Sequence, residues 1–217
     1  MSKWCKTLVA FLLLPLCVGA TKALILVVRS SGGADTVWIA LASGAACWLV
    51  VYTLLPRPMW LYIVGHEVTH VLWAWLFGAK VKRFKATAQG GHVEITKSNM
   101  LITLAPYFFP LYAGVVVLVF ATGHVVWGWT RYRLWFDYLL GMAYAFHATL
   151  TWQVLRTRQS DITQHGYLCS AVVIWLGSIG LLLVALPILT AQVTIPTALG
   201  WCLAETGAIL QRLARLL

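Results

Sequence analysis

Two histidines and a glutamate stand at the spacing of a zinc-hydrolase motif. They are His66, Glu67 and His70, in the run Gly65-His66-Glu67-Val68-Thr69-His70. Residues four apart project from one face of a helix, so His66 and His70 can share a metal ion. Glu67 directly follows His66 along the expected helix. From there its carboxylate can reach a metal-bound water and act as general base. The pattern predicts metal-assisted hydrolysis with one Zn²⁺ per chain.

A catalytic zinc takes three protein ligands and keeps a fourth position for water. The residue types alone leave the third ligand open, because any oxygen or imidazole ligand would fit. The candidates elsewhere in the chain are Asp161, Asp137, His147, His92, Glu94 and His165. For Asp161 a helix N-cap is the alternative role, since it directly precedes Ile162.

The composition places this chemistry in a membrane. Hydrophobic residues make up 61% of the 217 residues and charged residues only 10%, against about a quarter in ordinary globular domains. The formal charge of +10 comes from basic residues that lie mainly in short loops beside apolar runs, where they orient a chain and meet anionic lipid. We therefore expect contact with the lipid bilayer and no nucleic-acid partner. The five scattered cysteines predict no disulfide framework.

The apolar runs predict an all-α multi-pass protein with about six transmembrane helices. The expected spans cover residues 7–28, 36–55, 59–77, 100–122, 134–155 and 166–189. Residues 7–28 could instead be a signal peptide, although their apolar character continues past the small residues near Gly19. Pro106 and Pro110 should break or kink the fourth span.

We expect residues 1–217 to form one membrane domain. Its expected parts are two N-terminal spans at 1–55, a core at 59–191 that holds the histidine motif and a C-terminal segment at 194–217. The last segment could lie along the interface as an amphipathic helix or pack as a final span.

Residues 79–98 differ from the rest. Alternating side chains at 81–85 and 93–95 predict a β-hairpin around a turn that contains Gly90 and Gly91. This loop carries the densest group of basic residues, which favours the cytoplasmic side and an N-terminus outside. If an early segment is cleaved or does not span, the N-terminus changes side. We expect an integral protein of a bacterial inner membrane.

The residues after the histidine motif form a second, longer pattern. It consists, in order, of Phe77-Gly78, Lys80-Val81, Phe84 and Gly90-Gly91-His92-Val93. Together with the motif, this stretch from Gly65 to Val93 resembles the site-2 protease family of intramembrane zinc metalloproteases. In that family the zinc helix is followed by Phe-Gly, Lys-Val, a spaced Phe and a hairpin with Gly-Gly-x-Val.

The resemblance implies a role for each part of this stretch. His66 and His70 would bind zinc, Glu67 would be the catalytic base, and the hairpin would meet a membrane-protein substrate as an extended strand. The substrate-binding residues would then be Gly90, Gly91, His92 and Val93.

The family's third ligand is an aspartate on a later membrane helix, often within Asn-x-x-Pro-x-x-x-Leu-Asp-Gly. This chain departs from that form, because Gln153 stands where the asparagine would be and Ser160 precedes Asp161. Some family branches carry such a Ser-Asp pair, so the resemblance favours Asp161, with His147 next. His147 lies within an expected span, where an interhelical hydrogen bond or a contact to substrate or oxyanion would satisfy it.

Taken together, the sequence predicts a zinc metalloendopeptidase that cuts a peptide bond in or beside a membrane-spanning substrate. The alternative is a non-proteolytic membrane factor that keeps the fold and binds metal or a partner protein. Glu67 argues against it, since a scaffold needs no general base. A membrane di-iron oxidase would need several histidine-rich boxes, and the chain has one. The sequence does not specify an oligomeric state.

Overall fold

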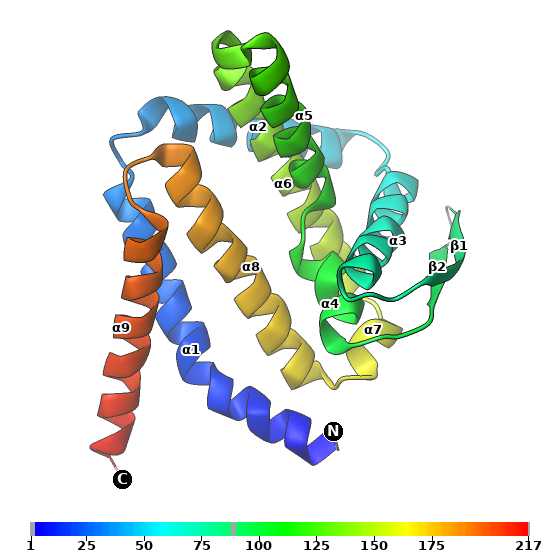
Figure 1. Ribbon diagram of the computed structural model, residues 1–217, viewed down its shortest axis with the longest axis vertical. Coiled ribbons are helices and arrows are strands. Elements are labelled where there is room, and N and C mark those ends of the chain that lie inside the picture. Colours follow the sequence, from blue (N-terminus) through cyan, green and yellow to red (C-terminus); the bar gives the residue numbers. More distant parts are fainter. Residues whose placement is uncertain (1–2, 88–89, 217) are drawn as a thin grey trace. The chain divides into compact units, whose positions relative to one another are not determined.

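The computed structural model describes residues 3–87 and 90–216 (Figure 1). Over these residues the chain is helical except for one two-stranded antiparallel sheet. The helices are α1 (Lys3–Ser30), α2 (Asp35–Leu54), α3 (Met59–Leu76), α4 (Met100–Phe108), α5 (Leu111–Trp127), α6 (Arg133–Leu155), α7 (Ser160–Thr163), α8 (Tyr167–Thr190) and α9 (Ile195–Ala214), with a 3₁₀ turn η1 at Trp129–Tyr132. The strands are β1 (Val81–Thr87) and β2 (Gly90–Ile95).

The chain forms two compact units. One is Thr36–Gln159, which holds the histidine motif, and the other joins the described residues up to Asp35 with those from Ser160 onward. Within the second unit, α1 packs along α8 and α9 (Figure 1). The α1–α9 pair is linked by Lys22 and Glu205, whose Nζ and Oε2 atoms are 3.2 Å apart.

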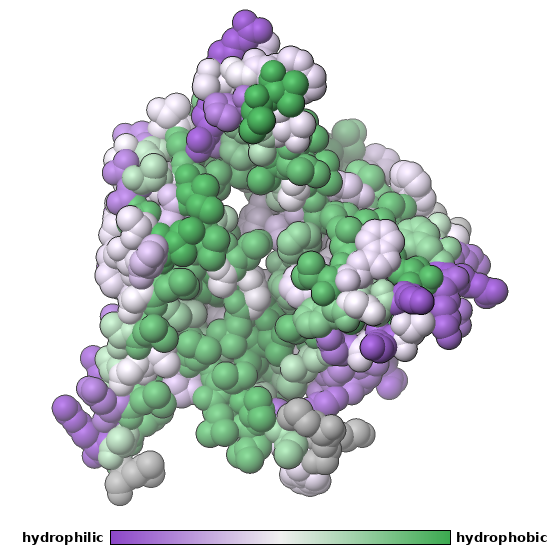
Figure 2. Space-filling view, viewed as in Figure 1, coloured by the Kyte–Doolittle hydropathy of each residue, from purple (hydrophilic) through white to green (hydrophobic). Residues whose placement is uncertain are grey.

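Three helices within the described residues are long and apolar enough to cross a membrane, namely α1 from Trp4, α2 and α8. The bent pair α4–α5 adds a fourth if it is counted as one broken span. Figure 2 shows hydrophobic residues spread over much of the visible surface, as expected for a protein in lipid. The two other expected spans, α3 and α6, are helical but fall outside this group. In α3 the reason is the polarity of His66, Glu67 and His70 in the middle of the helix.

The expected break in the fourth span is confirmed. Pro106 lies inside α4, Pro110 precedes α5, and the two helices meet at a bend of 76°. Asn99 starts α4, because its side-chain Oδ1 accepts a hydrogen bond of 2.8 Å from the Ile102 N–H. The short helix α4 is almost wholly buried from Ile102 to Phe108. It therefore forms an internal wall beside α3, against which it packs.

Glycines let α2 and α6 cross at very short distance. A Cβ atom on Gly44 would overlap the backbone carbonyl of Tyr138, and one on Gly141 would overlap that of Leu41. Two backbones can approach this closely only where neither carries a side chain at the crossing. Trp48 strengthens the same contact through a 2.8 Å hydrogen bond from Nε1 to Thr149 Oγ1.

The C-terminal half of α6 is held against α3 as well. The Tyr62 hydroxyl lies 3.1 Å from Thr151 Oγ1, and both side chains are buried. Trp48, Tyr62, Phe146 and Leu150 form one hydrophobic cluster of α2, α3 and α6. This cluster fixes the helix that carries His147 relative to the helix that carries the histidine motif.

The predicted hairpin is present, with one correction to its turn. β1 and β2 pair antiparallel, with Thr87 opposite Gly90 and Ala86 opposite Gly91. Gly90 and Gly91 therefore belong to β2 rather than to the turn. The connection consists of residues 88 and 89, which lie outside the described residues. The glycine pair was placed in the turn because glycine commonly marks turns, whereas close approach to Glu67 is what requires Gly91.

The C-terminal segment expected at 194–217 is the helix α9, which Thr194 caps through its side chain. Within the described part of the chain, α9 is not one of the helices apolar enough to cross a membrane. Ala198 and Cys202 are its buried residues, whereas Leu199 and Leu203 are exposed. Residue 217 lies outside the described residues.

Candidate metal centre

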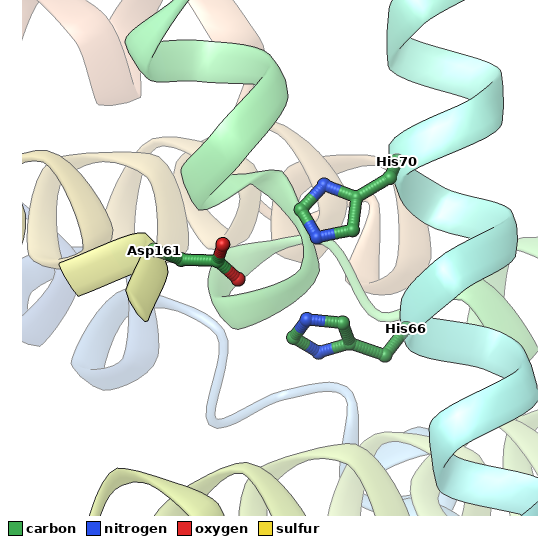
Figure 3. A group of neighbouring side chains, drawn as sticks. All are labelled: His66, His70 and Asp161. Atoms are coloured by element: carbon green, nitrogen blue, oxygen red, sulfur yellow. The ribbon is translucent and has the colours of Figure 1, made fainter. Parts of the chain in front are cut away.

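Helix α3 presents both histidines of the motif on one side. It begins after Pro58 and ends before Gly78, whose φ of +69° is a conformation that favours glycine at a helix end. The His66 and His70 rings, one turn apart, have centroids 5.0 Å from each other and planes inclined at 76° (Figure 3). The expected pairing of the two imidazoles is therefore realised by the helix itself.

A hydrogen bond from α3 to α4 fixes the orientation of His70. Its Nδ1 lies 2.9 Å from the backbone carbonyl of Ile102. A carbonyl only accepts, so Nδ1 carries the proton and Nε2 keeps its lone pair for a metal. This is the arrangement in which a second partner selects the tautomer of a metal-binding histidine.

Aromatic residues enclose His66. The Tyr107 ring of α4 meets it edge to face, with centroids 5.1 Å apart. The preceding residue, Gly65, lies against the ring of Tyr112, where a Cβ would be 2.7 Å from a ring carbon. Tyr112 is held there by a 2.6 Å hydrogen bond from its hydroxyl to the Leu61 carbonyl. The glycine before the motif thus allows α5 to lie directly on α3.

Asp161 is the second residue of the short helix α7. It follows Gln159, the last residue of the Thr36–Gln159 unit, by two residues, so chain connectivity keeps it within about 8 Å of that unit's end. His66, His70 and Asp161 each offer one ligand atom, and these atoms lie within 4.8 Å of one another (Figure 3). The group could hold a metal ion. Two imidazoles and one carboxylate match the donor set of a catalytic zinc site, which keeps one position open.

Glu67 is almost completely buried, with 7% of its surface exposed. The backbone of β2 lies directly against it, because a Cβ atom on Gly91 would be 2.5 Å from Glu67 Oε1 and closer still to Cγ. The hairpin therefore packs on the residue expected to act as base. Gly91 is needed here for space, since no side chain fits between the strand and the carboxylate.

Replacing Gly91 with alanine should displace the Glu67 carboxylate while leaving the fold intact, because the atoms in the way are the flexible end of a side chain. We expect the hydrolysis predicted from the sequence to slow by about 10²-fold, the lower range for loss of a positioned base, with little change in thermal unfolding. The matched control is Lys82→Ala, which shortens an exposed residue of the other strand, β1. Turnover of Gly91→Ala equal to that of the control would show that the contact does not matter.

His147, the other residue expected to meet substrate, lies on α6 beside His66. The two histidines line a small cavity of about 10 Å³, together with Thr69, Pro106 and Tyr112 among others. That volume has room for about one water molecule. His147 also makes a hydrogen bond to the backbone of Tyr107. The interhelical hydrogen bond expected for this buried-span histidine is thus present.

The remaining ligand candidates have other surroundings. Asp137 is buried and accepts hydrogen bonds of 3.1 and 3.0 Å from Arg133 Nε to its two oxygens. In the hairpin, Glu94 pairs with Arg83 in register, and His92 is exposed. His165 contacts Lys6, and its Nδ1 lies 3.1 Å from Lys6 Nζ. The pKa of His165 is lowered by burial first and by the Lys6 ammonium second, which favours the neutral form of its ring.

The backbone partner of His70 could not be identified from the sequence. Every residue has a carbonyl, so residue types give no signal for the role of Ile102. The available clue was Pro106, four residues later, because a proline within a helix leaves one carbonyl without its usual donor.

Comparisons with known proteins give no match. No protein-family model, no curated protein and no solved structure is significantly similar to this chain.

Proposed function

We propose that this protein is an intramembrane zinc metalloprotease that hydrolyses a peptide bond in or beside a membrane-spanning substrate. One observation carries the proposal, namely the group of His66, His70 and Asp161, whose ligand atoms lie within 4.8 Å, next to the buried Glu67. A scaffold would gain nothing from a buried carboxylate beside two histidines, since burying a charge costs free energy. A hydrolase needs that carboxylate to move a proton.

His66, His70 and Asp161 would hold the metal. When bound, zinc supplies Lewis-acid chemistry, as it polarises the scissile carbonyl and lowers the pKa of water to near neutrality. Glu67 takes the proton from the attacking water and gives it to the leaving amine. His147, which lines the cavity that it shares with His66, would contact the substrate there.

The hairpin supplies the contact for the substrate backbone. A helical substrate hides its peptide bonds in its own hydrogen bonds, so cleavage requires local unwinding. The edge of β2 near Gly90–Val93, which packs on Glu67 through Gly91, offers backbone partners to an unwound strand. In this proposal α3 and α6 also lie within the bilayer, which brings the spans to about six, and the protein is integral to a bacterial inner membrane.

The Asp161 side chain gives the most direct test of the ligand group. Asp161→Ala should lower zinc content, and Asp161→Asn should retain part of the zinc yet cleave a membrane substrate at least about tenfold more slowly, since a neutral amide is a poorer ligand. The measurement is the metal content of purified protein together with cleavage of a model transmembrane substrate in proteoliposomes. If Asp161 only stabilised the first turn of α7, where it lies, asparagine would substitute almost freely. Wild-type zinc content and cleavage in Asp161→Asn would therefore remove it from the ligand group.

A further inference from the structure

Helix α4 contains a backbone carbonyl that lacks its helical donor. In an α-helix the N–H of each residue bonds to the carbonyl four residues earlier. Pro106 has no N–H, so it cannot serve the carbonyl of Ile102. Ile102 is 1% exposed, which keeps bulk water away from this position. A buried carbonyl without a donor costs free energy, so another donor is required.

His70 supplies that donor. Its Nδ1 is 2.9 Å from the Ile102 oxygen, and the proton must sit on Nδ1 because the carbonyl can only accept. The consequence lies on the other side of the ring, where Nε2 is left as the nitrogen that can bind a metal. The missing N–H of one residue on α4 thus determines the tautomer of a histidine on α3.

A histidine also forms a hydrogen bond with the backbone at the end of α4. This histidine is His147, which lines the same cavity as His66. In a continuous helix the carbonyl of Tyr107 would accept a hydrogen bond from the N–H of Leu111. Leu111, however, starts α5 beyond the 76° bend at Pro110. The ring of His147 makes its hydrogen bond to the backbone of Tyr107. Near the two prolines, two backbone groups of α4 therefore form hydrogen bonds with histidines of neighbouring helices: Ile102 with His70, and Tyr107 with His147.

We propose that Pro106 is a positioning residue of the metal centre. By withholding a backbone N–H, it reserves the Ile102 carbonyl for His70 and so presents His70 Nε2 to the metal. An alanine at this position would restore a competing donor and loosen the ring. The consequence for metal binding rests on the proposed function, whereas the exchange of hydrogen bonds does not require a metal.

A double-mutant cycle on metal-free protein tests the hydrogen-bond exchange. Thermal or denaturant unfolding of the full chain in detergent with a chelator is measured for Pro106→Ala, His70→Ala and the double variant. His70→Ala alone leaves the Ile102 carbonyl without its donor and should lower the folding equilibrium constant about ten- to a hundredfold. In the Pro106→Ala background the new N–H takes over, so the same replacement should cost about tenfold less.

His66→Ala is the matched control for this cycle, because His66 belongs to the same helix face and packs against Tyr107. Its cost should be the same with proline or alanine at position 106. Coupling that is found for His70 and absent for His66 supports the inference. Additive effects of Pro106→Ala and His70→Ala overturn it.

A zinc titration tests the consequence for the metal centre. Pro106→Ala should weaken zinc binding about 10- to 100-fold, the range for loss of an outer hydrogen-bond partner of a ligand. The control is Pro187→Ala, which replaces a buried proline inside α8. Wild-type affinity in Pro106→Ala would overturn the positioning role. If the wild-type protein binds no zinc at all, the proposed function fails, and the metal-free cycle alone decides the present inference.

Discussion

Replacing Glu67 with glutamine should abolish most proteolysis while zinc binding and the fold persist. The amide has nearly the same shape and fits the buried site, but it cannot accept the proton of the attacking water. We expect turnover of a transmembrane substrate in proteoliposomes to fall by about 10²- to 10⁴-fold, the usual contribution of a general base. Zinc content and the unfolding midpoint should stay close to those of the wild type.

A matched control makes this result specific. Glu94→Gln is the matched control, because it makes the same chemical change on an exposed residue of β2 and should leave turnover unchanged. An active Glu67→Gln protein would rule out Glu67 as the base and return the non-proteolytic membrane factor to consideration.

Loss of either histidine ligand should remove the metal. His66→Ala and His70→Ala are each expected to weaken zinc binding by more than about 100-fold, since a lost ligand costs more than a lost outer partner. A bound ion also stabilises the folded state, by about 2.7 kcal/mol when its free concentration is a hundred times the Kd. Added zinc should therefore raise the unfolding midpoint of the wild type but not that of either variant.

His124→Ala is the control for this pair, because His124 is an exposed histidine near the end of α5. It should respond to zinc as the wild type does, and a chelator should abolish the zinc-dependent rise of the wild-type midpoint. Full zinc occupancy in the double variant of His66 and His70 would contradict the assignment of the metal centre.

The expected helices could be placed from sequence because each apolar run is self-contained. Hydrophobic length predicts a helix regardless of its neighbours, and all six expected segments are helical. The number that cross a membrane is harder to predict, because α3 carries polar residues whose cost depends on what surrounds them. The fold offsets that cost locally, for instance through the hydrogen bond between His70 and Ile102.

The hairpin shows where residue patterns reach their limit. Alternation predicted both strands, yet Gly90 and Gly91 were placed in the turn and lie in β2. Glycine is compatible with a turn and with close backbone approach, and only the position of Glu67 distinguishes the two. That position depends on how α3 packs against the hairpin, which residue types do not encode individually.

The features that the sequence determined by itself are those that follow from local covalent geometry. The spacing of His66 and His70 puts both rings on one helix face, and Pro106 removes one backbone donor, wherever the segments lie. The tertiary structure decided which groups these local features meet. It brought the Ile102 carbonyl to His70, the Gly91 backbone to Glu67 and Asp161 within ligand distance of both histidines. Such contacts join residues far apart in the chain, and they depend on the packing of whole helices rather than on any local pattern.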